Sequence, residues 1–140
     1  MELTLARARA ITEARNTAMM DCDIQAFLDL WADDCVVEGP EHYLEGKSQL
    51  RASIEQSWAA MKPVKMTTRS LAVEGDAMYY EFAVVWEIRS TGARMLLTGM
   101  TYHQVDEQCR LRFCREYFDP LGKPRRTAAE SPELAPLLAE

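Results

Sequence analysis

The chain has 140 residues, which is the size of one ordinary domain and too short for two. Charged residues make up 27% of it and hydrophobic residues 48%, as is typical of a globular protein in water. The net charge of −6 argues against nucleic acid or an anionic membrane as the main partner, because both attract basic surfaces.

The sequence carries no pattern of export, membrane insertion or metal binding. Residues 1–16 mix arginine with glutamate and lack the apolar segment of a signal peptide. No run approaches the roughly 20 apolar residues that a membrane-spanning helix needs. The cysteines show no CxxC pair and no histidine at zinc spacing; they are Cys22, Cys35, Cys109 and Cys114. We expect a cytoplasmic protein with reduced thiols and no metal site.

Apolar residues at helical spacing mark three helices in the first half of the chain. They are expected over residues 4–20, 24–31 and 47–61, with a short strand over 35–38 and a loop over 41–46 between the last two. Asp23 can cap the second helix with its side chain, and Pro63 is expected to close the third.

Apolar residues in every second position mark long antiparallel strands in the second half. They are expected over residues 64–74 and 77–89, followed by a hairpin within 94–119 that turns at Asp106-Glu107-Gln108. Centring this turn between Glu107 and Gln108 places Gly99 opposite Glu116 and Thr101 opposite Cys114.

The preceding turn, set near Ser90 or Thr91, pairs Tyr80 with Thr101 and Phe82 with Gly99. Because side chains alternate along a strand, both hairpins then share one largely apolar face that contains a carboxylate. The last hairpin contributes to it Leu97, Gly99, Thr101, His103, Arg112, Cys114, Glu116 and Phe118.

Helices followed by strands predict an α+β domain in which the helices cover one face of a curved antiparallel sheet. We expect one domain over residues 1–119. Residues 120–140 contain four prolines and no periodic pattern, so we expect a loosely held tail there.

Three segments resemble the signature segments of the nuclear transport factor 2-like superfamily, and within it the SnoaL-like polyketide cyclase and ketosteroid isomerase branch. They read DIQAFLDLWADDCVVEGP, EGKSQLRASIEQSW and GMTYHQVDEQCRLRFCREYFDP. The resemblance covers residues 6–120. It implies a cone, also described as a cystatin-like roll, in which a curved, mostly antiparallel sheet wraps around three N-terminal helices and encloses a cavity.

The resemblance also implies a homodimer that pairs through the convex face of the sheet. On the predicted alternation, this outer face carries large apolar side chains that a subunit interface would cover. They are Val85, Leu96, Met100, Tyr102, Phe113 and Tyr117.

The catalytic residues of the steroid isomerases do not carry over. Gly39 stands where that family has its catalytic carboxylate, and Thr101 where it has a protonated carboxylic acid. The family's tyrosine donor falls near Arg15. All three positions differ, so the resemblance implies the shape without steroid isomerisation by that route.

Glu116 is the main catalytic candidate. An apolar cavity would raise its pKa and make it a general acid or base near neutral pH. The alternative is a structural ion pair with Arg15 or Arg112.

Histidines and a second glutamate offer further candidates for proton transfer. His103 is expected at the rim of the cone, and His42 in the loop at its entrance. Glu38 would face the cavity if its strand slipped by one residue. Each has an ordinary alternative as a solvated side chain. Adjacent Asp33 and Asp34 are explained by turn chemistry.

Tyr80 and Thr101 can donate hydrogen bonds to a substrate oxygen, or satisfy each other in the core. The remaining concave residues are expected to bind the apolar part of a substrate. They are Arg15, Met19, Trp31, Trp58, Phe82, Trp86, Leu97, Gly99, Cys114 and Phe118.

The leading hypothesis is an enzyme without a cofactor, since no phosphate loop or nucleotide fingerprint occurs. It would cyclise, isomerise or dehydrate a hydrophobic, oxygen-bearing small molecule such as a polyketide or terpenoid intermediate. The alternative is a non-catalytic ligand-binding or dimerisation module. Epoxide hydrolysis ranks third, because Arg112 and Glu116 supply only part of an Asp-Arg-Asp set.

Overall fold

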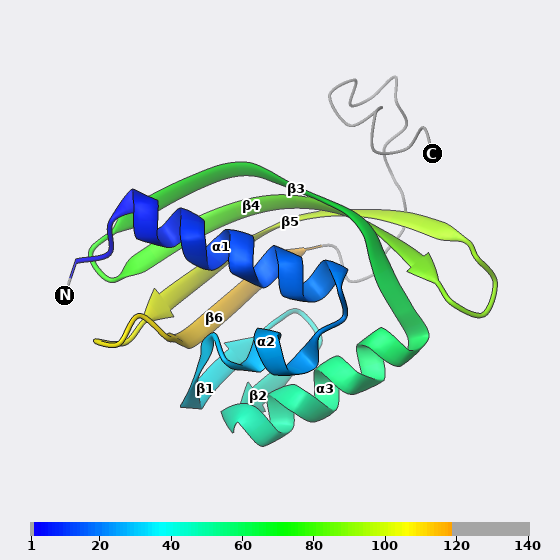
Figure 1. Cartoon of the computed structure of the whole chain (residues 1–140), viewed down its shortest axis with the longest axis horizontal. Coiled ribbons are helices and arrows are strands. Elements are labelled where there is room, and N and C mark those ends of the chain that lie inside the picture. Colours follow the sequence, from blue (N-terminus) through cyan, green and yellow to red (C-terminus); the bar gives the residue numbers. More distant parts are fainter. Residues whose placement is uncertain (1, 119–140) are drawn as a thin grey trace.

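A curved, unclosed sheet wraps around helices in the computed structural model, which describes residues 2–118 (Figure 1). The helices are α1 (Leu5–Met20), α2 (Ile24–Leu28) and α3 (Gly46–Ala60). The strands are β1 (Trp31–Glu38), β2 (Tyr43–Glu45), β3 (Met61–Glu74), β4 (Ala77–Ile88), β5 (Arg94–Val105) and β6 (Leu111–Phe118). The expected α+β class with a cone-like, mostly antiparallel sheet is confirmed.

The six strands lie in the order β2-β1-β6-β5-β4-β3. β1 pairs with β6 in parallel, and every other neighbouring pair is antiparallel. Helix α1 runs along the inner side of the long strands, and α2 and α3 lie below it in the view of Figure 1, next to β1 and β2. The predicted tail lies outside the described residues.

The second predicted helix is too long, and Pro63 does not close the third. The second helix stops at Leu28, because Trp31 already pairs with Leu111 in the sheet. The third ends at Ala60 before Pro63 is reached, and Pro63 lies inside β3 beside an irregularity in its pairing with β4. Proline lacks the N–H of a regular ladder, which accounts for the irregularity. The predicted cap of α2 is present, since Asp23 accepts a hydrogen bond from the backbone N–H of Ala26.

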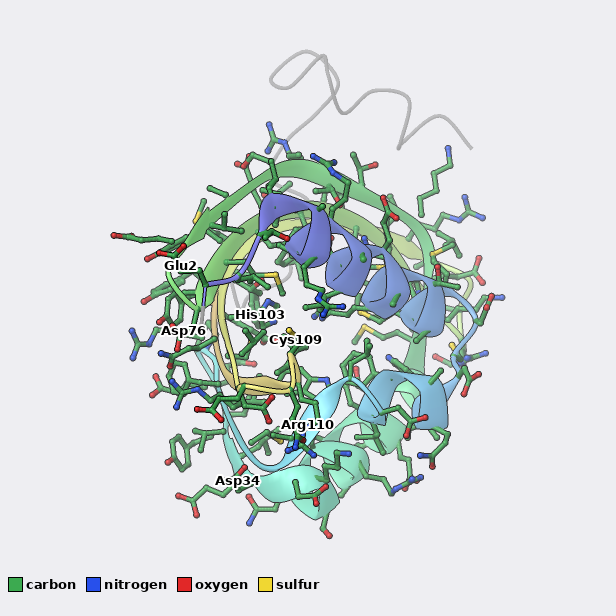
Figure 2. All side chains as sticks on the ribbon, turned by 60° about the vertical axis from the view of Figure 1, so that its left-hand side comes forward. Glu2, Asp34, Asp76, His103, Cys109 and Arg110 are labelled. Atoms are coloured by element: carbon green, nitrogen blue, oxygen red, sulfur yellow. The ribbon has the colours of Figure 1, made fainter. Side chains whose placement is uncertain are left out.

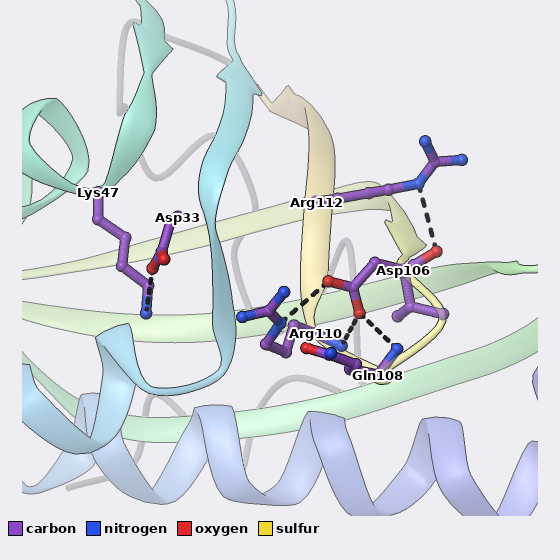
Figure 3. A network of polar contacts seen from close by, with 7 residues as sticks. Asp33, Lys47, Asp106, Gln108, Arg110 and Arg112 are labelled. Atoms are coloured by element: carbon purple, nitrogen blue, oxygen red, sulfur yellow. Dashed lines mark hydrogen bonds and ion pairs between the residues drawn. The ribbon is translucent and has the colours of Figure 1, made fainter.

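The last hairpin has a different register from the predicted one. Glu116 lies opposite Thr101, and Phe118 lies opposite Gly99. The Asp106 carboxylate accepts hydrogen bonds from the backbone N–H groups of Gln108 and Arg110, which makes the turn wider than the predicted one (Figure 3). The slip is two residues, so Glu116 keeps its predicted face.

Arg112 does not face the interior as predicted. Its Nε donates to the backbone oxygen of Val105 (Figure 3). Its Nη2 lies 3.1 Å from Asp76 Oδ2. The pairing of β5 with β6 is irregular between Gln104 and Val105, which breaks the simple alternation that the prediction used.

The outer face of the sheet is partly as predicted. Met100 and Tyr117 are 41% and 56% exposed. Val85 and Leu96 are buried, because they pack with Ala83 in a second apolar cluster on that face. Within residues 2–118, no helix is long and apolar enough to cross a membrane.

Candidate active site

A cavity of about 380 Å³ lies between the helices and the inner face of the sheet. All three tryptophans of the chain line it. The other lining residues are Arg15, Met19, Phe27, Val37, Glu41, His42, Leu44, Leu50, Ser53, Ile54, Ser57, Met61, Met66, Phe82, Val84, Met95, Leu97, Thr101, Glu116 and Phe118. Its size and mostly apolar wall suit a small organic molecule.

Glu116 supplies a carboxylate to this apolar wall from strand β6. Its side chain is 22% exposed, and its Oε2 lies 3.5 Å from Nε2 of His42. Burial raises the pKa of Glu116, while the nearby charges of Arg15 and His42 act in the opposite direction. The net shift makes this carboxyl group hold its proton to a higher pH than an ordinary glutamate does.

Neither arginine that was considered as an ion-pair partner contacts Glu116. Arg112 is engaged with Asp76 on the outside. Arg15 lines the cavity, but in the described part of the chain no ion pair joins it to Glu116. The partner of Glu116 is His42 instead, from the loop between β1 and β2.

The imidazole of His42 occupies the space beside Gly39. The backbone N–H of Gly39 donates to the His42 oxygen over 2.9 Å. A Cβ on Gly39 would lie 2.6 Å from Cε1 and 2.9 Å from Nε2 of this ring, closer than real contacts allow. The ring thus fills the place of a side chain at position 39, where the steroid isomerases have their catalytic carboxylate.

Replacing Gly39 with alanine should therefore displace the His42 ring from Glu116. We expect the NMR shifts of the His42 ring to change and the melting temperature to stay the same. Unaltered His42 shifts would show that the close contact is unimportant. Gly92→Asn, in an open turn outside the cavity, controls for loss of a glycine, because asparagine tolerates the left-handed φ of +72° at this position better than other residues do.

Three predicted catalytic residues lie outside the cavity wall. The Tyr80 hydroxyl donates to Asn16 Oδ1 over 3.2 Å, so it is used in packing α1 onto β4. Glu38 pairs with Arg115 Nε at 3.1 Å, because its neighbour Val37 takes the inward position. His103 is fully buried in the core instead of lying at the rim.

His103 belongs to β5, and its side chain faces Trp31 of β1. Its ring lies edge-on to Trp31, with centroids 6.0 Å apart, and its Nδ1 is 3.4 Å from the Thr101 hydroxyl. Figure 2 shows it on the inner side of the sheet. Burial, with a smaller contribution from Arg15, lowers the pKa of His103 to about 3. The ring is neutral at physiological pH, which does not suit proton transfer.

Gly99 and Cys114 do not line the cavity either. A Cβ on Gly99 would meet Cζ of Phe82 at 2.8 Å and the Tyr117 backbone oxygen at 2.7 Å. The space beside Gly99 is therefore already filled. Cys114 is fully buried, and burial raises the pKa of its thiol. The other eight predicted binding residues line the cavity: Arg15, Met19, Trp31, Trp58, Phe82, Trp86, Leu97 and Phe118.

Two serines of α3 are lining residues that the sequence reading did not single out as site residues. Ser53 and Ser57 lie one helical turn apart and add hydroxyls to the wall. The signal was available, since Ser53 is three residues after Leu50, on the core-facing stripe of this helix.

The acidic pair near β1 has no part in the cavity. Asp33 is 88% exposed and lies 3.5 Å from Lys47 (Figure 3), while Figure 2 shows Asp34 on the outside of the molecule. Among residues 2–118, no group of three or more His, Cys, Asp or Glu side chains could hold a metal ion.

Comparison with known families identifies the fold. The family model of the SnoaL-like domain matches residues 12–112. The chain belongs to the SnoaL-like family. Solved structures agree with this fold but are distant in sequence. No curated protein sequence matches the chain.

Three solved structures illustrate the range of proteins with this shape. A protein assigned as an isomerase from Bacillus subtilis has a TM-score of 0.75 at 18% identity, covering 83% of this chain and 88% of its own. An LEH-like epoxide hydrolase from M. tuberculosis has a TM-score of 0.73 at 17% identity, and the match covers 96% of this chain and 98% of the hydrolase. A computationally designed 17-OHP binder has a TM-score of 0.72 at 18% identity, and the match covers 83% of this chain and 95% of the binder. At such identities the likeness shows the fold alone.

Proposed function

We propose that this SnoaL-like protein is an enzyme that acts without a cofactor on a hydrophobic, oxygen-bearing small molecule, by proton transfer. The reaction class is isomerisation, cyclisation or dehydration. The observation that supports it is Glu116: a carboxylate with a raised pKa, in the wall of an apolar cavity of about 380 Å³, beside an imidazole.

Glu116 and His42 divide the proton transfer between them. The Glu116 carboxylate removes a proton from carbon next to a carbonyl group, and His42 can accept or return a proton at the cavity mouth. The Thr101 hydroxyl, also in the wall, can donate to the oxygen on which negative charge develops if it accepts, and does not donate, in its contact with Nδ1 of His103. Tyr80 has no part in this step, since its hydroxyl is bound to Asn16.

The elementary step can be tested before the natural substrate is known. 2-Tetralone is a small apolar ketone with exchangeable protons next to its carbonyl. Incubated with the protein in D2O, it should incorporate deuterium at those carbons faster than in buffer alone, as followed by ¹H NMR. An apolar inhibitor of similar shape, 2-naphthamide, should slow the exchange by competing for the cavity.

A second candidate function is a ligand-binding module without catalysis. The designed 17-OHP binder shows that a protein with this shape can bind a small molecule. The exchange assay separates the two functions: binding of 2-tetralone without any acceleration of exchange would replace the enzyme proposal with this one.

We also propose that the protein forms a homodimer through the outer face of the sheet. Exposed apolar side chains gather there: Tyr79 contacts Tyr102 at 5.4 Å between centroids, and Tyr102 contacts Phe113 at 6.0 Å. Met100 and Tyr117 extend the patch. Replacing Tyr117 with glutamate would bury a charge at this interface. We expect the mass in sedimentation equilibrium to fall from dimer to monomer, and an unchanged mass would locate the interface elsewhere.

A further inference from the structure

Several hydrogen-bond donors in the cavity wall are unused. Among residues 2–118, three lining side chains have a buried N–H nitrogen without a hydrogen-bond partner: Nε of Arg15 and the indole nitrogens of Trp31 and Trp86. Ser53 and Ser57 add hydroxyl groups. The acceptor oxygens come from two carboxylates, Glu116 and the exposed Glu41, and one oxygen of Glu116 already faces His42. A molecule that fits this wall must therefore bring acceptors of its own.

Arg15 is the most costly of these donors. It lies on α1, is only 8% exposed, and its guanidinium carbon is 5.8 Å from the centre of the Phe27 ring. A charge held away from water is expensive unless a close partner binds it, and no carboxylate of residues 2–118 lies within ion-pair distance of this guanidinium. By contrast, Arg110, Arg112 and Arg115 each pair with a carboxylate at 3.0 to 3.1 Å.

Arg15 does more than balance the charge of Glu116. Its positive charge acts on that carboxyl group from a distance, yet the contact within 4 Å is made by the partly exposed His42. A guanidinium placed as a counter-ion would be expected to form the bidentate pair that its planar shape favours. The Nε of Arg15 instead has no partner among the described residues and lies in a largely apolar wall.

We propose that Arg15 binds a carboxylate or another anionic oxygen of the substrate, and that the substrate class is therefore an apolar molecule with an acidic group. This deepens the proposed function, on which it rests for placing the substrate in this cavity. Trp31 and Trp86 complete the recognition as neutral donors. The arrangement leaves Glu116 and His42 for proton transfer and gives Arg15 the task of orienting the molecule.

A matched pair of probes tests acid recognition separately from catalysis. 2-Naphthoate and 2-naphthamide share a flat apolar body, and only the first carries a charge at pH 7.5. All three tryptophans line the cavity, so quenching of their fluorescence reports a probe bound there. Isothermal titration calorimetry should show the wild type preferring the acid by about tenfold or more, as a charge-assisted hydrogen bond provides.

Substitution of Arg15 should remove this preference. We expect Arg15→Gln to weaken naphthoate binding at least tenfold, and to change naphthamide binding by less than about twofold. Arg15→Lys should keep part of the acid preference through its charge. Arg9→Gln, an exposed position of the same helix, should bind both probes as the wild type does. Circular dichroism checks that each variant is folded.

Several outcomes would overturn the proposal. Equal affinities of the wild type for acid and amide would do so, as would no binding of either, or an acid preference that survives in folded Arg15→Gln. The Glu116→Gln variant separates this proposal from the catalytic one. It should bind naphthoate at least as tightly as the wild type, because a negative charge has been removed. Lost turnover with retained acid binding supports both proposals, and unchanged turnover with retained acid binding refutes only the catalytic one.

Discussion

Replacing Glu116 with glutamine should slow deuterium exchange into 2-tetralone by about 10² to 10⁴-fold, the usual contribution of a general acid or base. Glutamine has the same shape and cannot take up a proton at neutral pH. The cavity wall and its tryptophans remain in place, so the affinity for 2-naphthamide should change little. Exchange is measured by ¹H NMR, and the affinity by calorimetry on the same preparation.

Glu38→Gln is the matched control for this prediction. Glu38 is a glutamate of the neighbouring strand β1, but it pairs with Arg115 outside the cavity. The rate of deuterium exchange with the Glu38→Gln variant should match that with the wild type within about twofold. If Glu116→Gln is folded, binds 2-naphthamide and exchanges protons at the wild-type rate, Glu116 is not the proton-transfer group.

The stability of the protein should decrease as the pH is lowered below about 6.5, because of His103. Burial lowers the pKa of His103 from 6.5 to about 3 in the folded chain. Between these values the unfolded chain binds a proton at this residue and the folded chain does not, so acid favours unfolding. The contribution of the neutral His103 to the free energy of unfolding is fully present above pH 6.5. About 1.4 kcal/mol of it is lost per pH unit as the pH falls toward 3.

Urea unfolding at pH 7.5 and pH 5 measures this effect, which should amount to about 2 kcal/mol between them. His103→Gln should remove most of the difference, whatever its effect on stability at pH 7.5. His42→Gln, at a partly exposed imidazole, should keep it. Glu116 works in the opposite direction, since its raised pKa makes the folded chain bind a proton first, and this contribution cancels when wild type and His103→Gln are compared. If the free energy of unfolding depended on pH equally in the wild type and in His103→Gln, a buried neutral His103 would be contradicted.

The face of each long strand could be predicted from the sequence, whereas its register could not. Alternation placed Thr101 and Glu116 on the inner face. That they lie opposite each other, two residues away from the predicted register, depends on the Asp106 turn. Side-chain hydrogen bonds of this kind leave no trace in hydrophobic periodicity. Alternation also says nothing about depth, so His103 was assigned to the rim although Trp31 covers it in the core.

The candidate site combines predictable and unpredictable parts. The stripe of α3 and the aromatic residues of β4 pointed to a cavity wall, because their spacing fits a helix and a strand. The position of His42 against Gly39 depends on the fold of a loop, and the lack of a partner for Arg15 depends on the distances of all its neighbours. Neither follows from spacing in one sequence.

A ¹³C NMR titration of the Glu116 carboxyl group, assigned by its disappearance in Glu116→Gln, tests the central claim most directly. We expect a midpoint above that of an ordinary glutamate, because the apolar wall disfavours the charged form. Addition of 2-naphthamide should shift the resonance. An ordinary or lower midpoint that the amide leaves untouched would mean that this carboxylate lies in water, and no acid–base site would exist in the cavity.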